Sequence, residues 1–371
     1  MKLVVFGLSV TSSWGNGHAT LWRGLIGALG RLGHRVLFFE RDMPFYAQHR
    51  DLRELSGGEA ILYGSWQEIR RRAERELADA DAAIVTSYCP DAIPACEEVL
   101  SSPARIRCFY DLDTGVTLGR LRAGETVEYL PPRGLGDFDL VLSYTGGQAL
   151  AELKTRLGAR HVAALYGSVD PEVHHPVEPE ERFRADLSHL GTYSADRRAA
   201  LDDLFLEPAR RRPDLRFRIA GPQYPPDFPW TANIFFHPHI APADHAAFYC
   251  SSRLTLSVTR RPMAELGYCP SGRLFEAAAC GAPILSDEWE GLDYFFEPGR
   301  EILVARTTGH VMDALAMDDA ALRRIANAGR ERALANHTAA RRALELENIL
   351  EAAVSLPVEA GGGGAGVSPP E

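Results

Sequence analysis

Short apolar runs alternate with longer amphipathic segments along the chain, which is the pattern of strands and helices in α/β proteins. In the N-terminal half, the apolar runs predict strands at residues 2–7, 36–40, 82–86, 106–110 and 140–144. A helix is expected at residues 18–32, between the first two strands. Continuous apolar strands are typical of parallel sheets that helices cover on both faces.

The same pattern starts again in the second half. Strands are predicted at residues 186–190, 217–220, 234–236, 254–259 and 283–286, with a helix at 196–205 and helices from 319 to 354. Between the halves, residues 166–181 carry three prolines among several acids and read as a connection. We therefore expect an α/β fold of two doubly wound, Rossmann-like domains, at residues 1–167 and 168–354, followed by a flexible tail at 355–371.

Composition narrows the classes of partner. The 371 residues contain 40 Lys and Arg against 50 Asp and Glu, a formal net charge of -10. This balance predicts no nucleic-acid partner, because sequence-blind binding to phosphate backbones needs a basic face. No apolar run reaches the roughly 20 residues that span a bilayer. The six cysteines form no C-x-x-C pair and are expected to be reduced thiols in a cytoplasmic protein.

The loop after the first predicted strand is rich in glycine and carries a histidine. A dinucleotide fingerprint would need a third glycine where the chain has Thr20, although Glu40 stands where its acid would be. The alternative is that the glycines let the backbone approach a sugar or a phosphate. His18 then lies at the helix start and faces the cleft, where it suits a general base or a donor. A plain capping or packing role for His18 is the remaining alternative.

The most informative stretch covers residues 268–283. Pro270 and Ser271 predict a helix start, with Ser271 as N-cap. Gly272 exposes backbone N–H groups in the first turn, where a diphosphate can bind. Glu276 shares a helix face with Arg273 and can accept two hydrogen bonds from a ribose. The alternative is an ordinary surface pair between Arg273 and Glu276.

Two further loops follow predicted strands of the second half. Arg260 comes directly after the strand at 254–259, where its guanidinium can bind a diphosphate in bidentate fashion. A solvated pair with Arg261 is the alternative. The turn formed by Gly191, Thr192 and Tyr193 stands at an equivalent loop and can face the same phosphates.

These residues resemble those of the CgeB-like family of GT-B glycosyltransferases, in the glycogen-synthase-like branch (glycosyl transferases group 1). The matching segments are S-S-W-G-N-G-H-A-T at 12–20, F-E-R-D-M-P-F-Y-A at 39–47, Y-D-L-D-T at 110–114, L-S-Y-T-G-G at 142–147, L-G-T-Y at 190–193, P-S-G-R-L-F-E-A-A-A-C-G at 270–281 and W-E-G-L-D-Y-F-F-E-P-G at 289–299. The resemblance implies two domains facing a central cleft, with C-terminal helices packing back toward the N-terminal domain.

The resemblance also implies sugar transfer from a nucleotide diphosphate sugar, with UDP or dTDP as the nucleotide, to a small-molecule or glycan acceptor. It implies no other cofactor and no metal. The C-terminal domain would bind the donor and the N-terminal domain the acceptor. By position, the implied catalytic residues are His18 and Asp113. The implied donor-binding residues are Gly191, Thr192, Tyr193, Arg260, Ser271, Gly272, Arg273 and Glu276, and the implied acceptor or sugar contacts are Trp14, Gly15, Asn16, Gly17 and Asp111.

Two features keep alternatives open. Asp111 and Asp113 form an Asp-x-Asp pair, which holds a metal in GT-A glycosyltransferases, but those enzymes have one nucleotide-binding unit where this chain shows two. Retaining relatives usually carry a second Glu eight positions before Glu276, where this chain has Tyr268. Retention of configuration is therefore not implied. A nucleotide-sugar epimerase on the same fold and a non-catalytic coat or assembly protein are the alternative functions.

Overall fold

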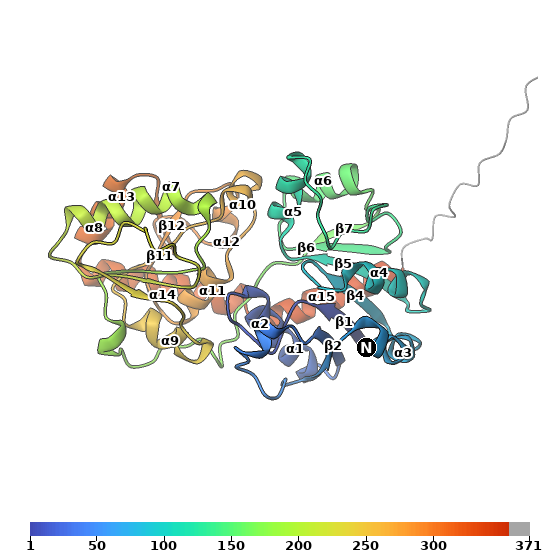
Figure 1. The fold of residues 1–371 in the computed structure, drawn as a ribbon. Coiled ribbons are helices and arrows are strands. Elements are labelled where there is room, and N and C mark those ends of the chain that lie inside the picture. The colour runs from blue at the N-terminus through green and yellow to red at the C-terminus, as the bar shows by residue number, and fades with distance from the viewer. Residues whose placement is uncertain (356–371) are drawn as a thin grey trace, which may run out of the picture.

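The computed structural model describes residues 1–355, which form two parallel β-sheets flanked by helices (Figure 1). The first sheet has seven strands in the order β3-β2-β1-β4-β5-β6-β7. Their bounds are β1 (Lys2–Gly7), β2 (Arg35–Arg41), β3 (Gly58–Tyr63), β4 (Ala82–Thr86), β5 (Ile106–Asp111), β6 (Leu140–Ser143) and β7 (Val162–Ala164). The order reverses direction beside β1, as it does in doubly wound sheets.

Helices cover both faces of this sheet. Their bounds are α1 (Gly17–Arg31), α2 (Pro44–Ala47), α3 (Trp66–Leu77), α4 (Ala92–Ser101), α5 (Thr114–Arg122) and α6 (Gln148–Leu157). The apolar side chains of α3, α4 and α6 are buried in one core, and those of α1 in the core on the opposite face. The continuous apolar strands predicted this double cover.

The second sheet has six parallel strands in the order β10-β9-β8-β11-β12-β13. Its strands are β8 (Leu187–Leu190), β9 (Phe217–Ala220), β10 (Ile234–His237), β11 (Thr255–Ser257), β12 (Ile284–Asp287) and β13 (Leu303–Ala305). The helices around it are η1 (Glu181–Phe183), η2 (Ala195–Arg197), α7 (Arg198–Leu201), η3 (Asp202–Leu206), α8 (Glu207–Arg211), α9 (Pro242–Cys250), α10 (Arg261–Leu266), α11 (Gly272–Ala279), α12 (Leu292–Phe295), α13 (Thr308–Ala316) and α14 (Asp319–Asn336).

The predicted α/β architecture is confirmed, and every predicted strand is present with ends within two residues of the prediction. Three strands were not predicted. β7 and β13 are only three residues long, and β3 is an edge strand whose half-exposed pattern breaks the apolar run. The helix predicted at 196–205 extends to Arg211 through a π-helical turn, η3, in its middle.

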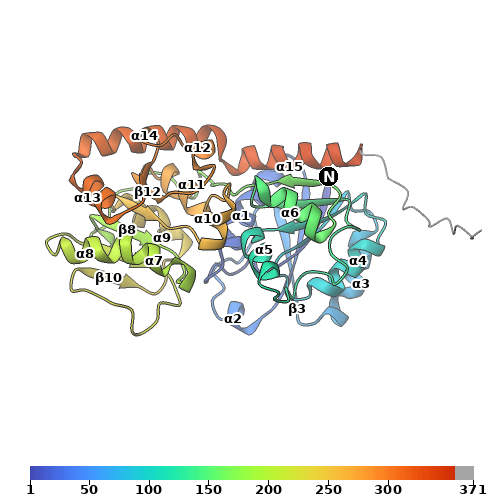
Figure 2. The same ribbon diagram turned by 90° about the horizontal axis from the view of Figure 1, so that it is seen from above.

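The last helix, α15 (Ala339–Val354), leaves the second sheet and returns to the first. Figure 2 shows α14 over the second unit and α15 over the first, nearly end to end. Ala343, Leu346 and Leu350 of α15 are fully buried in the core that α1 also fills. The chain passes between the two units twice, once near Val169 and once between α14 and α15. These two connecting segments touch, because Val169 exchanges backbone hydrogen bonds with His337 and Ala339 (2.9 and 2.7 Å). This double connection sets the position of one sheet against the other.

Two predictions concern the ends of the chain and the membrane. The flexible tail predicted at 355–371 lies, except for its first residue, outside the described residues. Among residues 1–355, no helix combines the length and the apolar character that crossing a membrane requires.

Candidate active site

A cavity of about 610 Å³ lies between the two units. Its walls come from loops after β1 and β5 of the first sheet and after β8, β9 and β11 of the second, together with the start of α11. These loops follow the carboxyl ends of parallel strands, which is where open α/β sheets bind ligands. Every site residue predicted from the sequence lines this cavity except Trp14 and Asp111.

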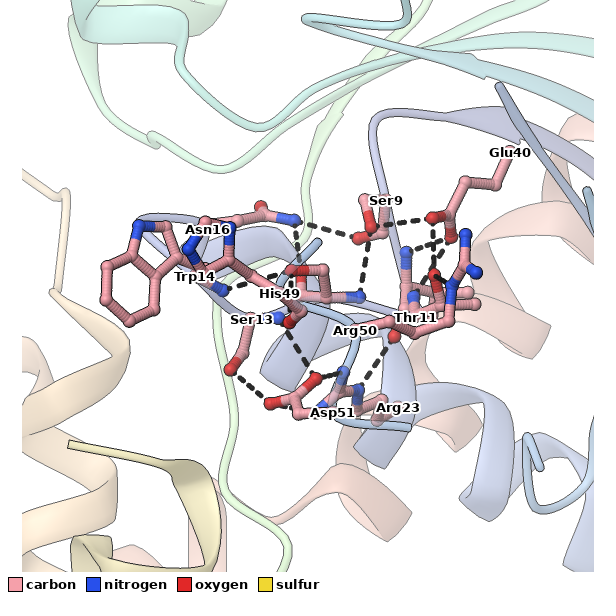
Figure 3. A network of polar contacts seen from close by, with 12 residues as sticks. Ser9, Thr11, Ser13, Trp14, Asn16, Arg23, Glu40, His49, Arg50 and Asp51 are labelled. Carbon is pink, nitrogen blue, oxygen red and sulfur yellow. Dashed lines mark hydrogen bonds and ion pairs between the residues drawn. The ribbon is translucent and has the colours of Figure 1, made fainter. Parts of the chain in front are cut away.

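The loop after β1 is held from inside its own unit by a buried carboxylate (Figure 3). Glu40, fully buried at the end of β2, accepts hydrogen bonds from the hydroxyls of Ser9 (2.8 Å) and Thr11 (2.6 Å). It also accepts the backbone N–H groups of Val10 (2.7 Å) and Thr11 (3.0 Å). Glu40 is therefore not free to bind a ribose, and the dinucleotide interpretation of this loop is wrong.

Asn16 forms the junction between this loop and α1. Its amide donates to the carbonyls of Ser9 (2.9 Å) and Ser12 (3.0 Å), and its Oδ1 accepts the N–H of His18 (3.0 Å). Asn16 is the N-cap of α1 and is almost fully buried. These bonds engage its side chain, so Asn16 positions His18 at the cavity wall.

His18 and Asp113 meet across the carboxyl edge of the first sheet. The Nε2 of His18 lies 2.8 Å from Oδ2 of Asp113, and that oxygen also accepts the hydroxyl of Ser87 (3.0 Å). Burial alone would raise the pKa of Asp113, but the nearby His18, the hydrogen bonds from His18 and Ser87, and Arg260 bring it below its usual value. Asp113 is thus held as a carboxylate against the imidazole, the arrangement that orients a general base.

The two site predictions that do not fit are Asp111 and Trp14. Asp111 is fully buried below the cavity and accepts the N–H of Asp113 (3.0 Å). Burial and the charge of Asp113 raise the pKa of Asp111 to about 7. Trp14 lies between His49, on which it stacks, and His239, whose ring is tilted against it, with ring centroids 4.3 Å away on each side. Asp111 therefore supports Asp113, and Trp14 joins the two units at the edge of the cavity.

Opposite His18, the start of α11 brings backbone N–H groups and a guanidinium to the wall. Ser271 occupies the N-cap position of α11, as predicted, but its side chain makes no capping bond and instead accepts from Nε of Arg273 (3.1 Å). Nη1 of Arg273 donates to the carbonyl of Leu190 (2.6 Å). A Cβ at Gly191 would overlap that guanidinium, so any other residue there would have to displace the Arg273 side chain from this position.

Arg273 belongs to a cluster with two more arginines. Arg260 lies at the wall but pairs with Asp196 (Nη2 to Oδ2, 2.8 Å). Arg197, which the sequence reasoning missed, is 9% exposed and donates through Nη1 to the carbonyl of Thr192 (2.7 Å). Its Nε has no partner among residues 1–355. Burial and the charges of Arg273 and Arg260 lower the pKa of Arg197 to about 9, so an anion in the cavity would relieve this repulsion.

Glu276 faces two histidines. Its Oε2 accepts the hydroxyl of Tyr249 (3.3 Å) and lies 3.5 Å from Nδ1 of His245 and 3.9 Å from Nε2 of His174. Burial opposes ionisation, but His174, His245 and Arg273 lower the pKa of Glu276 to about 2. Glu276 is 6% exposed, so the alternative of a surface pair with Arg273 is wrong.

This trio is the one group of possible metal ligands found in the described part of the chain. The donor atoms of His174, His245 and Glu276 all lie within 4.8 Å of one another. Two imidazoles and a carboxylate are a donor set that zinc accepts. No local sequence pattern marks the trio, because the ligands come from three separate segments: the interdomain connection, α9 and α11. Asp111 and Asp113 are not part of any such group.

Tyr268, at the position of the missing acid, does not line the cavity. Its backbone is in the left-handed region (φ 45°), and its N–H donates to the carbonyl of Glu290 (2.7 Å). The ring lies against Gly147 and Gly291, where a Cβ would come within 2.7 and 2.6 Å of it. Two other non-glycine residues with positive φ, Tyr88 and Gln223, do line the cavity. Such strained positions gather at functional sites.

Comparisons with known proteins agree with this arrangement. Residues 197–348 match a family described as glycosyl transferase-like. No curated protein sequence matches the chain. Among solved structures, sucrose-phosphate synthase from Thermosynechococcus elongatus is similar at a TM-score of 0.68 and 14% identity, over 96% of this chain and 99% of that chain.

Two further similar structures were solved with ligands bound. HepE from Anabaena, in complex with UDP and glucose, is similar at a TM-score of 0.64 and 14% identity, over 95% of this chain and 100% of that one. An α-glucosyltransferase in complex with UDP-glucose and DNA containing an abasic site has a TM-score of 0.69 and 12% identity, over 95% and 99% of the two chains. At these identities the likeness shows the fold, which is that of two-domain glycosyltransferases.

Proposed function

We propose that this chain is a metal-independent glycosyltransferase that moves a sugar from a nucleotide diphosphate sugar to an acceptor hydroxyl. The observation that carries the proposal is the chemistry of the cavity walls. One wall presents the arginine cluster of Arg197, Arg260 and Arg273 with Glu276, and the other presents the pair of His18 and Asp113. The match of residues 197–348 to a glycosyl transferase-like family supports it, as do the complexes of similarly folded proteins with UDP and with UDP-glucose.

The arginine cluster and the start of α11 are suited to the diphosphate. The first N–H groups of α11 have no side-chain cap, and they lie at the positive end of the helix. Arg197 is buried with an unpartnered Nε among the described residues, beside two further guanidiniums. A departing diphosphate placed there gains hydrogen bonds and charge neutralisation without a metal ion.

Glu276 is suited to the ribose hydroxyls. Its contacts within the protein fall on Oε2, and both Glu276 and His245 line the cavity. An ionised carboxylate accepts hydrogen bonds from vicinal hydroxyls, and its lowered pKa keeps it ionised. The donor would thus span from Glu276 through the arginine cluster toward His18. We propose UDP or dTDP as its nucleotide, by the resemblance to CgeB-like enzymes.

The first unit would supply the acceptor site. His18 lies there with Asp113 behind it, next to the loop of Gly15, Asn16 and Gly17. Closure of the two units around the donor would exclude water from the reactive sugar and protect it from hydrolysis. The acceptor is a small molecule or a glycan under this proposal, and the acidic net charge of the chain favours it over nucleic acid.

The two alternative functions make different demands on the same cavity. An epimerase on this fold would need no acceptor and would release a changed nucleotide sugar. A coat or assembly protein would have no use for a cationic cluster in the cavity between the two units. The buried, incompletely bonded Arg197 favours an anion-binding enzyme over the second alternative.

Thermal stability in the presence of candidate donors tests the proposal. UDP-, dTDP-, GDP- and ADP-sugars should be screened against the full chain, since a ligand that binds only the folded state raises its melting temperature. We expect a rise with a UDP- or dTDP-sugar, and a smaller rise when Arg197→Gln meets the same ligand at the same concentration. The exposed Arg261 pairs with Glu265 away from the cavity, so Arg261→Gln is the matched control and should respond like the parent. If no nucleotide sugar raises the melting temperature of the parent, the proposal fails.

A further inference from the structure

We propose that His174, His245 and Glu276 bind Zn²⁺ at the wall of the cavity, and that this ion and the nucleotide compete for Glu276. The competition rests on the proposed function, because only a nucleotide whose ribose reaches Glu276 can displace the ion. The metal site itself does not rest on it. The ion takes no part in sugar transfer and blocks the donor while it is bound.

The side chain of His245 has a fixed tautomer. Its Nε2 lies 3.2 Å from the carbonyl oxygen of Ile240, which can only accept a hydrogen bond, so Nε2 carries the proton. In the neutral imidazole, Nδ1 then carries a lone pair. Nδ1 has no hydrogen-bond partner among residues 1–355 and lies 3.5 Å from Oε2 of Glu276. Two acceptor atoms therefore face each other, and a cation between them would turn their repulsion into attraction.

His174 faces the same carboxylate oxygen from the interdomain connection. It is 4% exposed, and neither of its ring nitrogens has a hydrogen-bond partner in the described part of the chain. Its Nε2 lies 3.9 Å from Oε2 of Glu276. Buried polar groups without partners are rare in proteins, because each one costs free energy. An ion bonded to one ring nitrogen of His174 would remove part of this cost.

The spacing of the donor atoms favours an ion over a shared proton. A hydrogen bond between an imidazolium and a carboxylate is about 2.7–2.9 Å long, whereas the two nitrogens lie 3.5 and 3.9 Å from Oε2 of Glu276. Donor atoms on one tetrahedral zinc ion are about 3.3 Å apart, because bonds from zinc to nitrogen and oxygen are about 2.0–2.2 Å long. All three donor atoms are within 4.8 Å of one another, so shifts of less than about 1 Å would close the trio around an ion.

The types of ligand select zinc among the common divalent ions. Magnesium and calcium take oxygen ligands, whereas imidazole suits zinc and other late transition metals. The trio supplies three of the four positions of a tetrahedron. The fourth opens to the cavity, because His245 and Glu276 line it, and a water molecule can fill that position. The carbonyl of Ile240 behind His245 is also a usual outer partner of a histidine that binds a metal.

The same opening makes the ion and the donor exclude each other. The ribose would approach the carboxylate of Glu276 from the cavity, where the ion and its water would lie. The ion also takes up the negative charge to which the ribose hydroxyls would donate. We therefore expect the site to hold metal only while the nucleotide is absent.

Titration with Zn²⁺ alone tests the metal site. The full chain is treated with EDTA, freed of the chelator and titrated by calorimetry at neutral pH. We expect the parent to bind one Zn²⁺ at the trio and no Mg²⁺ there. His174→Ala and His245→Ala should each weaken Zn²⁺ binding by about 100-fold or more, since even the loss of an outer partner costs about 10- to 100-fold. Circular dichroism identifies the folded variants. Failure of the parent to bind Zn²⁺, or parent-like binding by a folded variant, overturns the inference.

Two control variants separate this site from other zinc ligands of the chain. A hydrogen bond with Cys280 lowers the pKa of the partly buried Cys250 thiol, and thiolates bind zinc. His310 is an exposed histidine outside the cavity. Cys250→Ser and His310→Ala should both bind Zn²⁺ as the parent does. Loss of binding in Cys250→Ser would place the ion at that thiol and contradict the assignment to the trio.

Titration of UDP with and without Zn²⁺ tests the competition. Saturating Zn²⁺ should weaken UDP binding to the parent by about tenfold or more, the loss expected when the hydrogen bonds to Glu276 are missing. In His174→Ala the affinity for UDP should not depend on Zn²⁺, and this comparison corrects for Zn²⁺ that UDP binds in solution. Equal weakening in the parent and the variant would overturn the competition. If UDP does not bind even without metal, the proposed function and the competition both fail, whereas the titration with Zn²⁺ alone still decides the metal site.

Discussion

The loops that follow β1 and β8 occupy corresponding places in the two sheets, yet they are held by opposite charges. The first is fixed by Glu40, whose buried carboxylate receives four hydrogen bonds from residues 9–11. The second is fixed by arginines, since Arg273 donates to Leu190 and Arg197 donates to Thr192. A buried acid anchors one loop, and two arginines, of which Arg197 is buried and Arg273 is partly buried, anchor the other.

The two loops also differ in what remains unsatisfied. The hydrogen-bond donors around Glu40 all bond to its carboxylate within the first unit, so this loop holds His18 in place without a ligand. Around the second loop, Arg197 keeps an unpartnered Nε in the described structure, and its pKa is lowered by burial and by its neighbours. Incomplete bonding of a buried charge is costly, and it points to a ligand that supplies the missing anion. This difference supports the proposal that the first unit carries the chemistry and the second unit binds the donor.

The largest effect should come from removing the imidazole of the first unit. His18→Ala should lower turnover by about 100-fold or more, because proton transfer by a positioned base contributes at least that much. The affinity for the nucleotide should stay within a few-fold of the parent, since its contacts lie in the second unit. Initial rates and isothermal titration with UDP measure the two quantities. Turnover within a few-fold of the parent would make His18 only a residue of the helix start.

The next effect concerns the cation of the second loop. Arg197→Gln should weaken binding of the nucleoside diphosphate by roughly 10- to 100-fold, the loss expected for one charged hydrogen bond of about 1.5–3 kcal/mol. Binding of the nucleoside without phosphates should not change. Titrations of UDP and uridine against the variant and the parent separate these outcomes. A loss that is equal for both ligands would mean that Arg197 shapes the fold of the loop and does not bind the diphosphate.

Glu276→Ala should lower the affinity for the nucleotide by about tenfold or more, because charged hydrogen bonds to the ribose are lost. The pKa of Glu276 lies near 2, below its usual value, so its charge is present above that pKa and is lost only as pH falls through it. Affinity through Glu276 should therefore be constant between neutral and mildly acidic pH. Comparison of UDP with its 2′,3′-dideoxy analogue locates the contact. A folded variant that binds UDP as the parent does would contradict the ribose assignment.

A smaller effect is expected from the anchor of the first loop. Glu40→Gln removes the charge and turns an amide N–H₂ toward donors, which should lower the free energy of unfolding by about 1–2 kcal/mol. Chemical denaturation measures this change. Turnover should fall through misplaced His18, while UDP affinity stays at the parent value. Weakened UDP binding would show that the two loops are coupled, and it would contradict separate roles for the first unit in chemistry and the second unit in donor binding.

Removal of metal should have the smallest effect. We predict unchanged activity after exhaustive chelation with EDTA, because the arginines and the start of α11 can neutralise the diphosphate. If chelation removes activity, Zn²⁺ restores it and His174→Ala prevents that rescue, then an ion needed for activity binds at the trio of His174, His245 and Glu276. If Mg²⁺ or Mn²⁺ restores activity and Asp113→Asn abolishes the rescue, the ion belongs to Asp111 and Asp113 instead.

The strands and site loops of this molecule that depend on local sequence patterns could be predicted from the sequence. Strands such as β1, β4 and β9 were predicted with their observed bounds, because buried apolar residues dominate each of them. The site loops could be found because they directly follow those strands. Glu276 could be found because it stands on the same helix face as Gly272 and Arg273.

The rest depends on contacts between segments distant in the chain. His174 and His245 meet Glu276 only because the interdomain connection and α9 pack beside α11. Arg197 stands in a surface-like run of charged residues, and nothing local marks it as buried. Asp111 has the acidic side chain expected of a residue that contacts a ligand. It is the last residue of strand β5, however, and is fully buried, so it does not reach the cavity.

Release of the nucleoside diphosphate from a sugar donor is the most direct test of the central claim. The full chain is incubated with each donor that raises its melting temperature, and the freed nucleotide is measured by chromatography, with Arg197→Gln and His18→Ala in parallel. The account predicts that UDP or dTDP is released by the parent. It predicts weakened donor binding in the first variant, and loss of release with binding intact in the second. Absence of release by the parent from every donor that it binds would contradict the account.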